Sequence, residues 1–173
     1  MTTLNIDKHT TSLTPICRDD PDIGDDELLW RLVMTTPDSA TSDCGRRPQS
    51  GSFRDPQMSV DRARLSTIAD TLSLEPGRDI AEFTAKNVRD LGLRVYADSC
   101  FICRCCGSHL GTNPVCPKCK SDRNVYHNKA HAIVCPAMRE AAARKFAKDT
   151  ATLLNITEED RKIARDLGPA GMK

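Results

Sequence analysis

The stretch from Cys100 to Cys119 constrains this chain most, because it holds six of the nine cysteines. Two Cys-x-x-Cys pairs, Cys103/Cys106 and Cys116/Cys119, lie within it. Both thiolates of such a pair can bind one cation if the backbone turns sharply, and Gly107 and Pro117 favour that turn. Four thiolates form a closed tetrahedral site without a vacant position. The spacing therefore predicts a structural metal site, and we expect the metal to be Zn²⁺.

The sequence leaves some choice of ligands. Cys100 and Cys103 form a third, overlapping Cys-x-x-Cys pair, and Cys105 is adjacent to Cys106, so Cys100 or Cys105 could replace a predicted ligand. Gly107 directly after Cys106 favours Cys103 and Cys106 as the ligands of the first pair. Two pairs in one hairpin are not typical of a thioredoxin-like redox site, whereas an iron–sulfur cluster would suit the same thiolates.

The pattern Cys103-x-x-Cys106-Gly107 followed by Cys116-Pro-x-Cys119 resembles the short zinc-ribbon family, in which two knuckles face each other. The resemblance covers about twenty residues and departs from the family at Lys120, where a second glycine is usual. It implies that residues 100–123 are a zinc-ribbon insertion.

The remaining sequence predicts a small single α+β domain formed by residues 25–99 and 124–173. Residues 1–24 are polar and without periodicity, which predicts a flexible N-terminal arm with Cys17 as a lone surface thiol. No apolar run approaches the roughly 20 residues that span a bilayer, so no membrane association is expected. Because the cysteines cluster as metal-type pairs, we expect a reducing, cytoplasmic location.

Hydrophobic periodicity predicts the elements of this domain. Residues 25–34 suit either a helix that begins at Asp25 or a short buried strand, and residues 35–57 suggest a long loop. The pattern then predicts strands over 58–61, 93–97, 124–127 and 131–135, and helices over 63–72, 79–91, 138–154 and from Thr157 onward.

Four short segments give a second resemblance. They are Leu28–Arg31, Pro48–Asp55, Met58–Asp61 and Asn128–Ala132, and together they are similar to a group of small uncharacterised bacterial proteins with an LLWR…SxxF…MSVD…NxAHA pattern. The resemblance supports a single domain that carries an inserted ribbon, and it implies no activity.

The net charge of +1 argues against strong non-specific binding of nucleic acid. The charge is uneven, since residues 94–149 hold ten Lys or Arg and four Asp or Glu. We therefore expect an accessory or adaptor protein whose ribbon contacts a protein partner, with nucleic acid as the other possibility. The candidate contact residues are Arg104, Lys118, Lys120, Arg123 and Lys129.

The alternative is an enzyme that acts on a phosphorylated or nucleotide substrate. Its candidate residues are Arg31, Ser52, Arg54 and His131, because arginines and hydroxyls bind phosphate and histidine transfers protons. No catalytic signature joins them, so the sequence favours the adaptor. His127, His131 and Cys135 are spaced such that they could form a second metal site.

Overall fold

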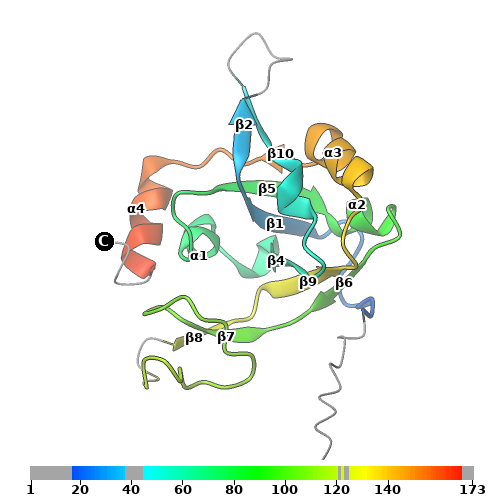
Figure 1. Cartoon of the computed structure of the whole chain (residues 1–173). Helices are drawn as coiled ribbons and strands as arrows, with labels where there is room; N and C mark the ends of the chain where they lie inside the picture. Colours follow the sequence, from blue (N-terminus) through cyan, green and yellow to red (C-terminus); the bar gives the residue numbers. More distant parts are fainter. Residues whose placement is uncertain (1–16, 38–44, 121, 123–124, 169–173) are drawn as a thin grey trace, which may run out of the picture.

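The computed structural model describes residues 17–37, 45–120, 122 and 125–168. Its centre is a sheet of six antiparallel strands in the order β10-β5-β1-β4-β9-β6 (Figure 1). These strands are β1 (Leu28–Val33), β4 (Met58–Arg62), β5 (Asp79–Thr84), β6 (Arg94–Ala97), β9 (His131–Cys135) and β10 (Thr152–Leu153). Two small antiparallel ribbons accompany the sheet, β2 (Thr35–Pro37) with β3 (Arg46–Pro48) and β7 (Cys100–Cys103) with β8 (Val125–Asn128).

Four short helices cover the sheet, and the predicted α+β class is confirmed. The helices are α1 (Ile68–Leu72), α2 (Ala85–Arg89), α3 (Glu140–Asp149) and α4 (Glu158–Leu167), with two 3₁₀ turns, η1 (Ser50–Phe53) and η2 (Ala63–Leu65). Residues of α2 and α3 pack in the larger apolar cluster on one face, and residues of α1 and α4 pack in the smaller cluster on the other.

The larger cluster is built from the alternate, inward-facing residues of the central strands. Three of the four phenylalanines meet at its centre, where the ring centroids of Phe53, Phe83 and Phe146 lie 5.1–6.1 Å apart in edge-on contacts. Such contacts add specific geometry to the burial of aromatic surface. They fix η1, which carries Phe53, against the sheet and α3.

The opposite face of the sheet divides into an apolar and a polar part. Trp30 and Leu32 of β1 and Ile80 of β5 pack under α1 and α4. Further along this face, Asp61 of β4 lies directly opposite His131 of β9 in the strand register. Polar groups at a buried position need partners, so this part of the sheet requires a polar cover.

That cover is the hairpin, by which we mean residues 100–128. It lies beside β9 and β6 at the foot of the molecule (Figure 1). Its strands pair with each other from Cys100↔Asn128 to Cys103↔Val125, and not with the main sheet. The hairpin therefore includes residues 125–128, beyond the predicted limit of the insertion at residue 123.

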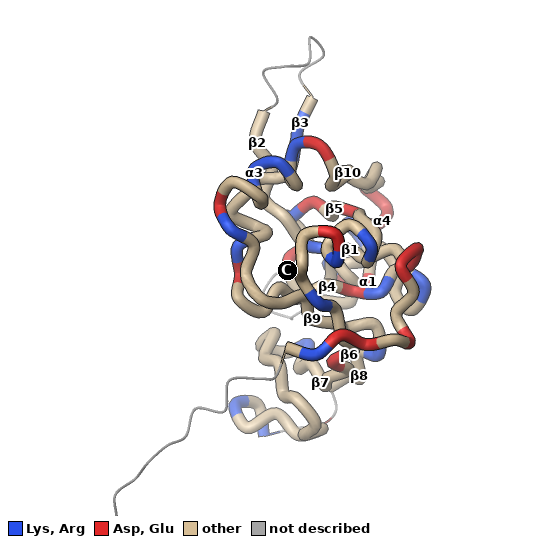
Figure 2. Tube along the Cα trace, turned by 90° about the vertical axis from the view of Figure 1, so that its right-hand side faces the viewer, with Lys and Arg blue, Asp and Glu red and all other residues tan. Residues whose placement is uncertain are grey.

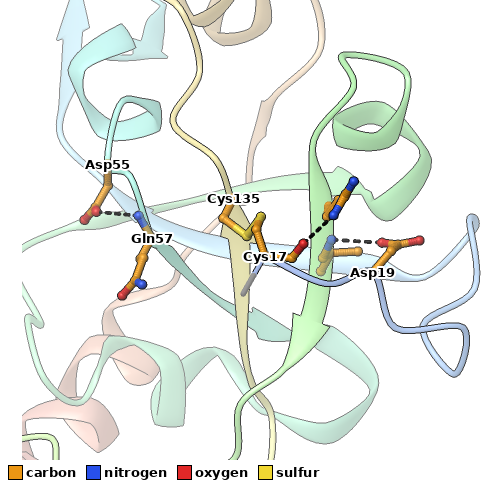
Figure 3. Close-up of a disulfide and its surroundings, with 7 residues drawn as sticks. Cys17, Asp19, Asp55, Gln57 and Cys135 are labelled. Atoms are coloured by element: carbon orange, nitrogen blue, oxygen red, sulfur yellow. Dashed lines mark hydrogen bonds between the residues drawn. A yellow bond between two sulfur atoms is a disulfide. The ribbon is translucent and has the colours of Figure 1, made fainter. Parts of the chain in front are cut away.

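The predicted N-terminal arm is wrong for residues 17–24. Ile23 is fully buried in the larger cluster, and Asp20 N donates to the Val95 carbonyl at 2.9 Å. Cys17 is not a free surface thiol but is bonded to Cys135 at the end of β9 (Figure 3). This pair also departs from the expectation that the cysteines are reduced. Residues 1–16 lie outside the described residues.

The helix predicted over residues 79–91 is also wrong in its first half, which forms β5. Asp79, Ile80, Ala81 and Phe83 are buried because β5 lies between β1 and β10, and cross-strand pairing overrides the helical periodicity. The helix α2 begins only at Ala85, with Thr84 in a capping box. Of the two alternatives for residues 25–34, the strand is confirmed.

The other predictions have mixed outcomes. The helix predicted over 63–72 is divided into η2 and the short helix α1, and the segment 35–57, which suggested a long loop, contains β2, β3 and η1. Strands over 58–61, 93–97 and 131–135 are confirmed as β4, β6 and β9, and the helix that follows Thr157 has the expected cap. The helix predicted over 138–154 is shorter, since it begins at Glu140 and ends at Asp149. None of the helices among the described residues has the length and apolar character that a membrane crossing requires.

We predict that the Cys17–Cys135 bond stabilises the fold. Cys17→Ser should lower the free energy of unfolding by about 3–5 kcal/mol, because the bond closes a loop between residues 118 positions apart. Denaturant unfolding without reductant measures the change, with Cys105→Ser as the control at an exposed cysteine. Equal stability of Cys17→Ser and the parent, or free thiols at both Cys17 and Cys135, would contradict the prediction.

Candidate metal centre and pocket

The four predicted ligands meet at one point of the hairpin. The sulfur atoms of Cys103, Cys106, Cys116 and Cys119 all lie within 4.8 Å of one another, so these residues could hold a metal ion. The distances are 3.8 Å between Cys103 and Cys119 and 3.5 Å between Cys106 and Cys116. A metal–sulfur bond of ~2.3 Å in a tetrahedral site places sulfurs about 3.8 Å apart, so the observed spacing suits such a site.

Two similar backbone turns bring the sulfurs together. In the first, Gly107 N donates to the Cys103 carbonyl at 2.7 Å, and Gly107 has a φ of +69°. In the second, Lys120 N donates to the Cys116 carbonyl at 2.8 Å, with a φ of +49° at Lys120. The residue after each pair therefore adopts the left-handed conformation, including the position where lysine replaces the usual glycine.

The environments of the four thiols differ. Cys103 and Cys116 are buried, whereas Cys106 is exposed. Hydrogen bonding with the side chain and backbone of Ser108 lowers the pKa of Cys106 to about 6, while burial raises the pKa of Cys103. The lowered pKa favours the thiolate form of Cys106, which is the form that binds a metal cation.

The other two cysteines of the stretch are not part of this group. Cys105 is exposed and lies outside the cluster. Cys100 is buried in β7, and its sulfur lies 3.7 Å from His109 Nδ1. The structure therefore favours the predicted set of four and places Cys100 in different surroundings.

A pocket of about 460 Å³ lies where the hairpin covers the polar part of the sheet. All four segments of the second resemblance contribute to its wall, through Trp30 and Arg31, Gly51 and Ser52, Ser59 to Asp61, and Asn128 with His131. The hairpin supplies Ile102, His109 and Tyr126, and α1 with the following turn supplies the rim. Segments far apart in the sequence thus build one cavity.

Arg31 occupies the point where β1 and β4 stop pairing. The register between these strands ends with Trp30↔Asp61. Beyond it, Arg31 Nη1 donates to the Ser59 carbonyl at 2.7 Å and Nε donates to the Ser52 carbonyl at 3.2 Å. Its Nη2 lies 3.9 Å from an Asp55 carboxylate oxygen, which leaves hydrogen-bonding capacity for a ligand. Burial lowers the pKa of this guanidinium, which still remains charged at neutral pH.

The structure brings together three of the four residues predicted for an enzyme. Arg31, Ser52 and His131 line the pocket, but Arg54 does not. Arg54 is half exposed and lies 3.8 Å from Glu140 of α3, because the buried ring of Phe53 turns the next residue outward.

The predicted site of His127, His131 and Cys135 does not form. Cys135 is bonded to Cys17, and His127 stacks on Phe101 with ring centroids 4.7 Å apart. His131 lies instead beside His109, with ring centroids 5.5 Å apart. His109 and Asp61 also line the pocket, although their sequence spacing does not predict it, because strand register and hairpin docking bring them there.

The basic residues predicted for partner contact differ in their exposure. Lys118, Lys120 and Lys129 are exposed, and basic residues are visible on the outer loop of the hairpin (Figure 2). Arg104 instead faces the domain, with its guanidinium 4.3 Å from the centre of the Tyr126 ring and 3.9 Å from Asp70 of α1. Arg104 therefore helps to dock the hairpin, and Arg123 lies outside the described residues.

Comparison with known proteins gives no match to a protein-family model, a curated protein or a solved structure.

Exchanging the residues after the two cysteine pairs tests the backbone geometry. Gly107→Ala should weaken metal binding by the four cysteines by about 1 kcal/mol, roughly fivefold, because alanine is strained at a φ of +69°. Lys120→Gly should strengthen binding by a similar factor, since it removes the same strain. Competition with a chromophoric chelator measures both affinities. A Gly107→Ala variant that binds the metal as tightly as the parent, or a Lys120→Gly variant that binds it more weakly, would contradict the proposed turns.

Proposed function

We propose that this protein binds a small phosphorylated or nucleotide-like molecule in the pocket, and that zinc bound by the hairpin holds one wall of that pocket in place. The observation that carries the proposal is the convergence of Arg31, Ser52 and His131, from three separate elements, on one cavity. Its volume of about 460 Å³ lies in the range of small-molecule sites.

The choice of zinc rests on the donor set. Four thiolates with tetrahedral spacing suit Zn²⁺, and they leave no position for a substrate, so this ion is structural. Iron suits the same donors but would make the protein coloured. The two turns after Cys106 and Cys119 support an inserted zinc ribbon, with the limits extended to residue 128.

The choice of ligand rests on the donors in the pocket. Arg31 is a largely buried cation whose Nη2 has only a 3.9 Å contact with Asp55, and arginine binds phosphate oxygens through paired N–H groups. Arg78 contributes a second guanidinium at the rim, and Ser52 and Tyr126 add hydroxyl groups. The ring of Trp30 lines the same cavity and offers an apolar surface beside these donors.

Binding of adenosine monophosphate, measured by isothermal titration calorimetry, tests the proposal. Arg31→Gln should weaken binding about 10- to 100-fold, the effect of losing a charged hydrogen-bond donor. The matched control is Arg54→Gln, which lies outside the pocket and should bind as the parent does.

Because Arg31 also holds two backbone carbonyls, Arg78→Gln at the rim serves as the second variant and should weaken binding without loss of thermal stability. Removal of zinc should abolish binding as well. Absence of binding by the parent, or equal binding by the Arg31 and Arg54 variants, would refute the proposed pocket.

A second candidate function is partner contact through the outer loop of the hairpin. Val115 is 45% exposed and lies near Lys118 and Lys120, which gives an apolar and basic surface. Because the total charge is near zero, we expect no shift of duplex DNA at physiological salt and favour an acidic protein partner. A salt-dependent shift that Lys118→Glu removes would instead identify nucleic acid as the partner.

A further inference from the structure

A second group of metal-ligand type lies between the hairpin and the sheet. It consists of Cys100 of β7, His109 of the hairpin and His131 of β9, whose ligand atoms all lie within 4.8 Å of one another. The Cys100 sulfur is 3.7 Å from His109 Nδ1. Zinc bonds of ~2.3 Å to sulfur and ~2.0–2.1 Å to nitrogen in a tetrahedron imply a separation of about 3.6 Å, so this pair already has the required spacing.

His131 is held in the orientation of a metal ligand. Its Nδ1 lies 2.8 Å from the carbonyl oxygen of Asp98, and a carbonyl can only accept, so Nδ1 carries the proton. Nε2 is then left as a lone-pair donor. A ring whose N–H bonds a backbone carbonyl while the other nitrogen binds the metal is the usual arrangement in such sites.

The Nε2 atom of His131 is buried. His131 is only 5% exposed, and among the described residues Nε2 makes no hydrogen bond. A buried acceptor without a partner costs about 1–3 kcal/mol. Cys100 is buried as well, and His109 and His131 both line the pocket. A cation between the three side chains would satisfy Nε2 and would face the cavity.

We propose that Cys100, His109 and His131 bind a second zinc ion whose fourth coordination position opens into the pocket and takes an oxygen of a small anionic ligand. Three protein ligands with one open position are typical of zinc that acts on a substrate, in contrast to the closed four-cysteine site. One thiolate and two imidazoles suit zinc rather than magnesium or calcium.

The surroundings support an oxygen ligand at the open position. Asp61 lies opposite His131 in the β4–β9 register and lines the same pocket. Its carboxylate is held by the Thr71 hydroxyl at 2.8 Å and the Asn128 amide at 3.1 Å. Asp61 is thus fixed beside the site, where it can accept a hydrogen bond from a zinc-bound water or a protonated phosphate. Arg31, in the same wall, supplies positive charge for the rest of the anion.

Metal analysis of the full chain tests the site. The parent should hold about two zinc ions per chain, and His109→Gln, His131→Gln and Cys100→Ser should each hold about one. The matched controls are His127→Gln and Cys105→Ser, which lie outside the group and should keep both ions. His109 is exposed on the hairpin, so its variant should fold even if the buried His131 variant does not.

The second zinc site rests on the proposed pocket, but the failure of this site and the failure of the pocket would give different results. One zinc in the parent that persists in the His109 variant refutes the second site and leaves the four-cysteine site standing. Because the four-cysteine site shapes the hairpin that carries Cys100 and His109, Cys116→Ser should lose both ions, whereas His109→Gln should lose only one. Retention of one ion by Cys116→Ser would contradict the dependence of the second site on the first.

Cobalt substitution tests the open position. Inorganic phosphate should change the visible spectrum of the Co²⁺ protein and should have no effect on the His109→Gln variant, which retains only the closed site. An unchanged spectrum of the Co²⁺-loaded parent at millimolar phosphate refutes an open position facing the pocket.

Discussion

The hairpin cannot fold on the strength of its own core. Among its described residues, Ile102 is the one buried aliphatic side chain, and the other buried positions are Cys100, Cys103 and Cys116. A segment that buries so little apolar surface does not offset the entropy of ordering its backbone. Metal binding of the type proposed for the four cysteines contributes on the order of 10 kcal/mol, which is sufficient. If the four cysteines bind a metal ion as proposed, the shape of the hairpin depends on that ion.

The pocket depends on the hairpin in turn. The main sheet provides Arg31, Asp61 and His131, but these side chains form one wall only. The hairpin closes the cavity with Ile102, His109 and Tyr126, and it is docked by Arg104, which lies over Tyr126 near Asp70. The proposed second zinc would tie the hairpin to the sheet directly, because it joins Cys100 and His109 to His131. In this proposal the first ion would shape the wall of the pocket, and the second would connect that wall to the domain.

The sequence allowed the four-cysteine group to be predicted because its ligands are close along the chain and are followed by turn-forming residues. It also allowed Arg31, Ser52 and His131 to be selected by chemical type. Their convergence could not be derived, since it depends on strand order and on the pairing that ends at Trp30↔Asp61. The same applies to the Cys17–Cys135 bond, whose partners are 118 positions apart. The strand β5 was mistaken for a helix because burial on both faces removes the alternation of polar and apolar residues.

Amide hydrogen exchange with and without zinc tests most directly whether metal binding shapes the hairpin. On zinc removal, the amides of Cys103, Gly107 and Lys120, which bond within the hairpin, should exchange at rates close to those of an unfolded chain. The amides of β1 and β5, which lie in the middle of the sheet, should stay protected. Full protection of the hairpin amides in the zinc-free protein would contradict the dependence of this wall on the metal.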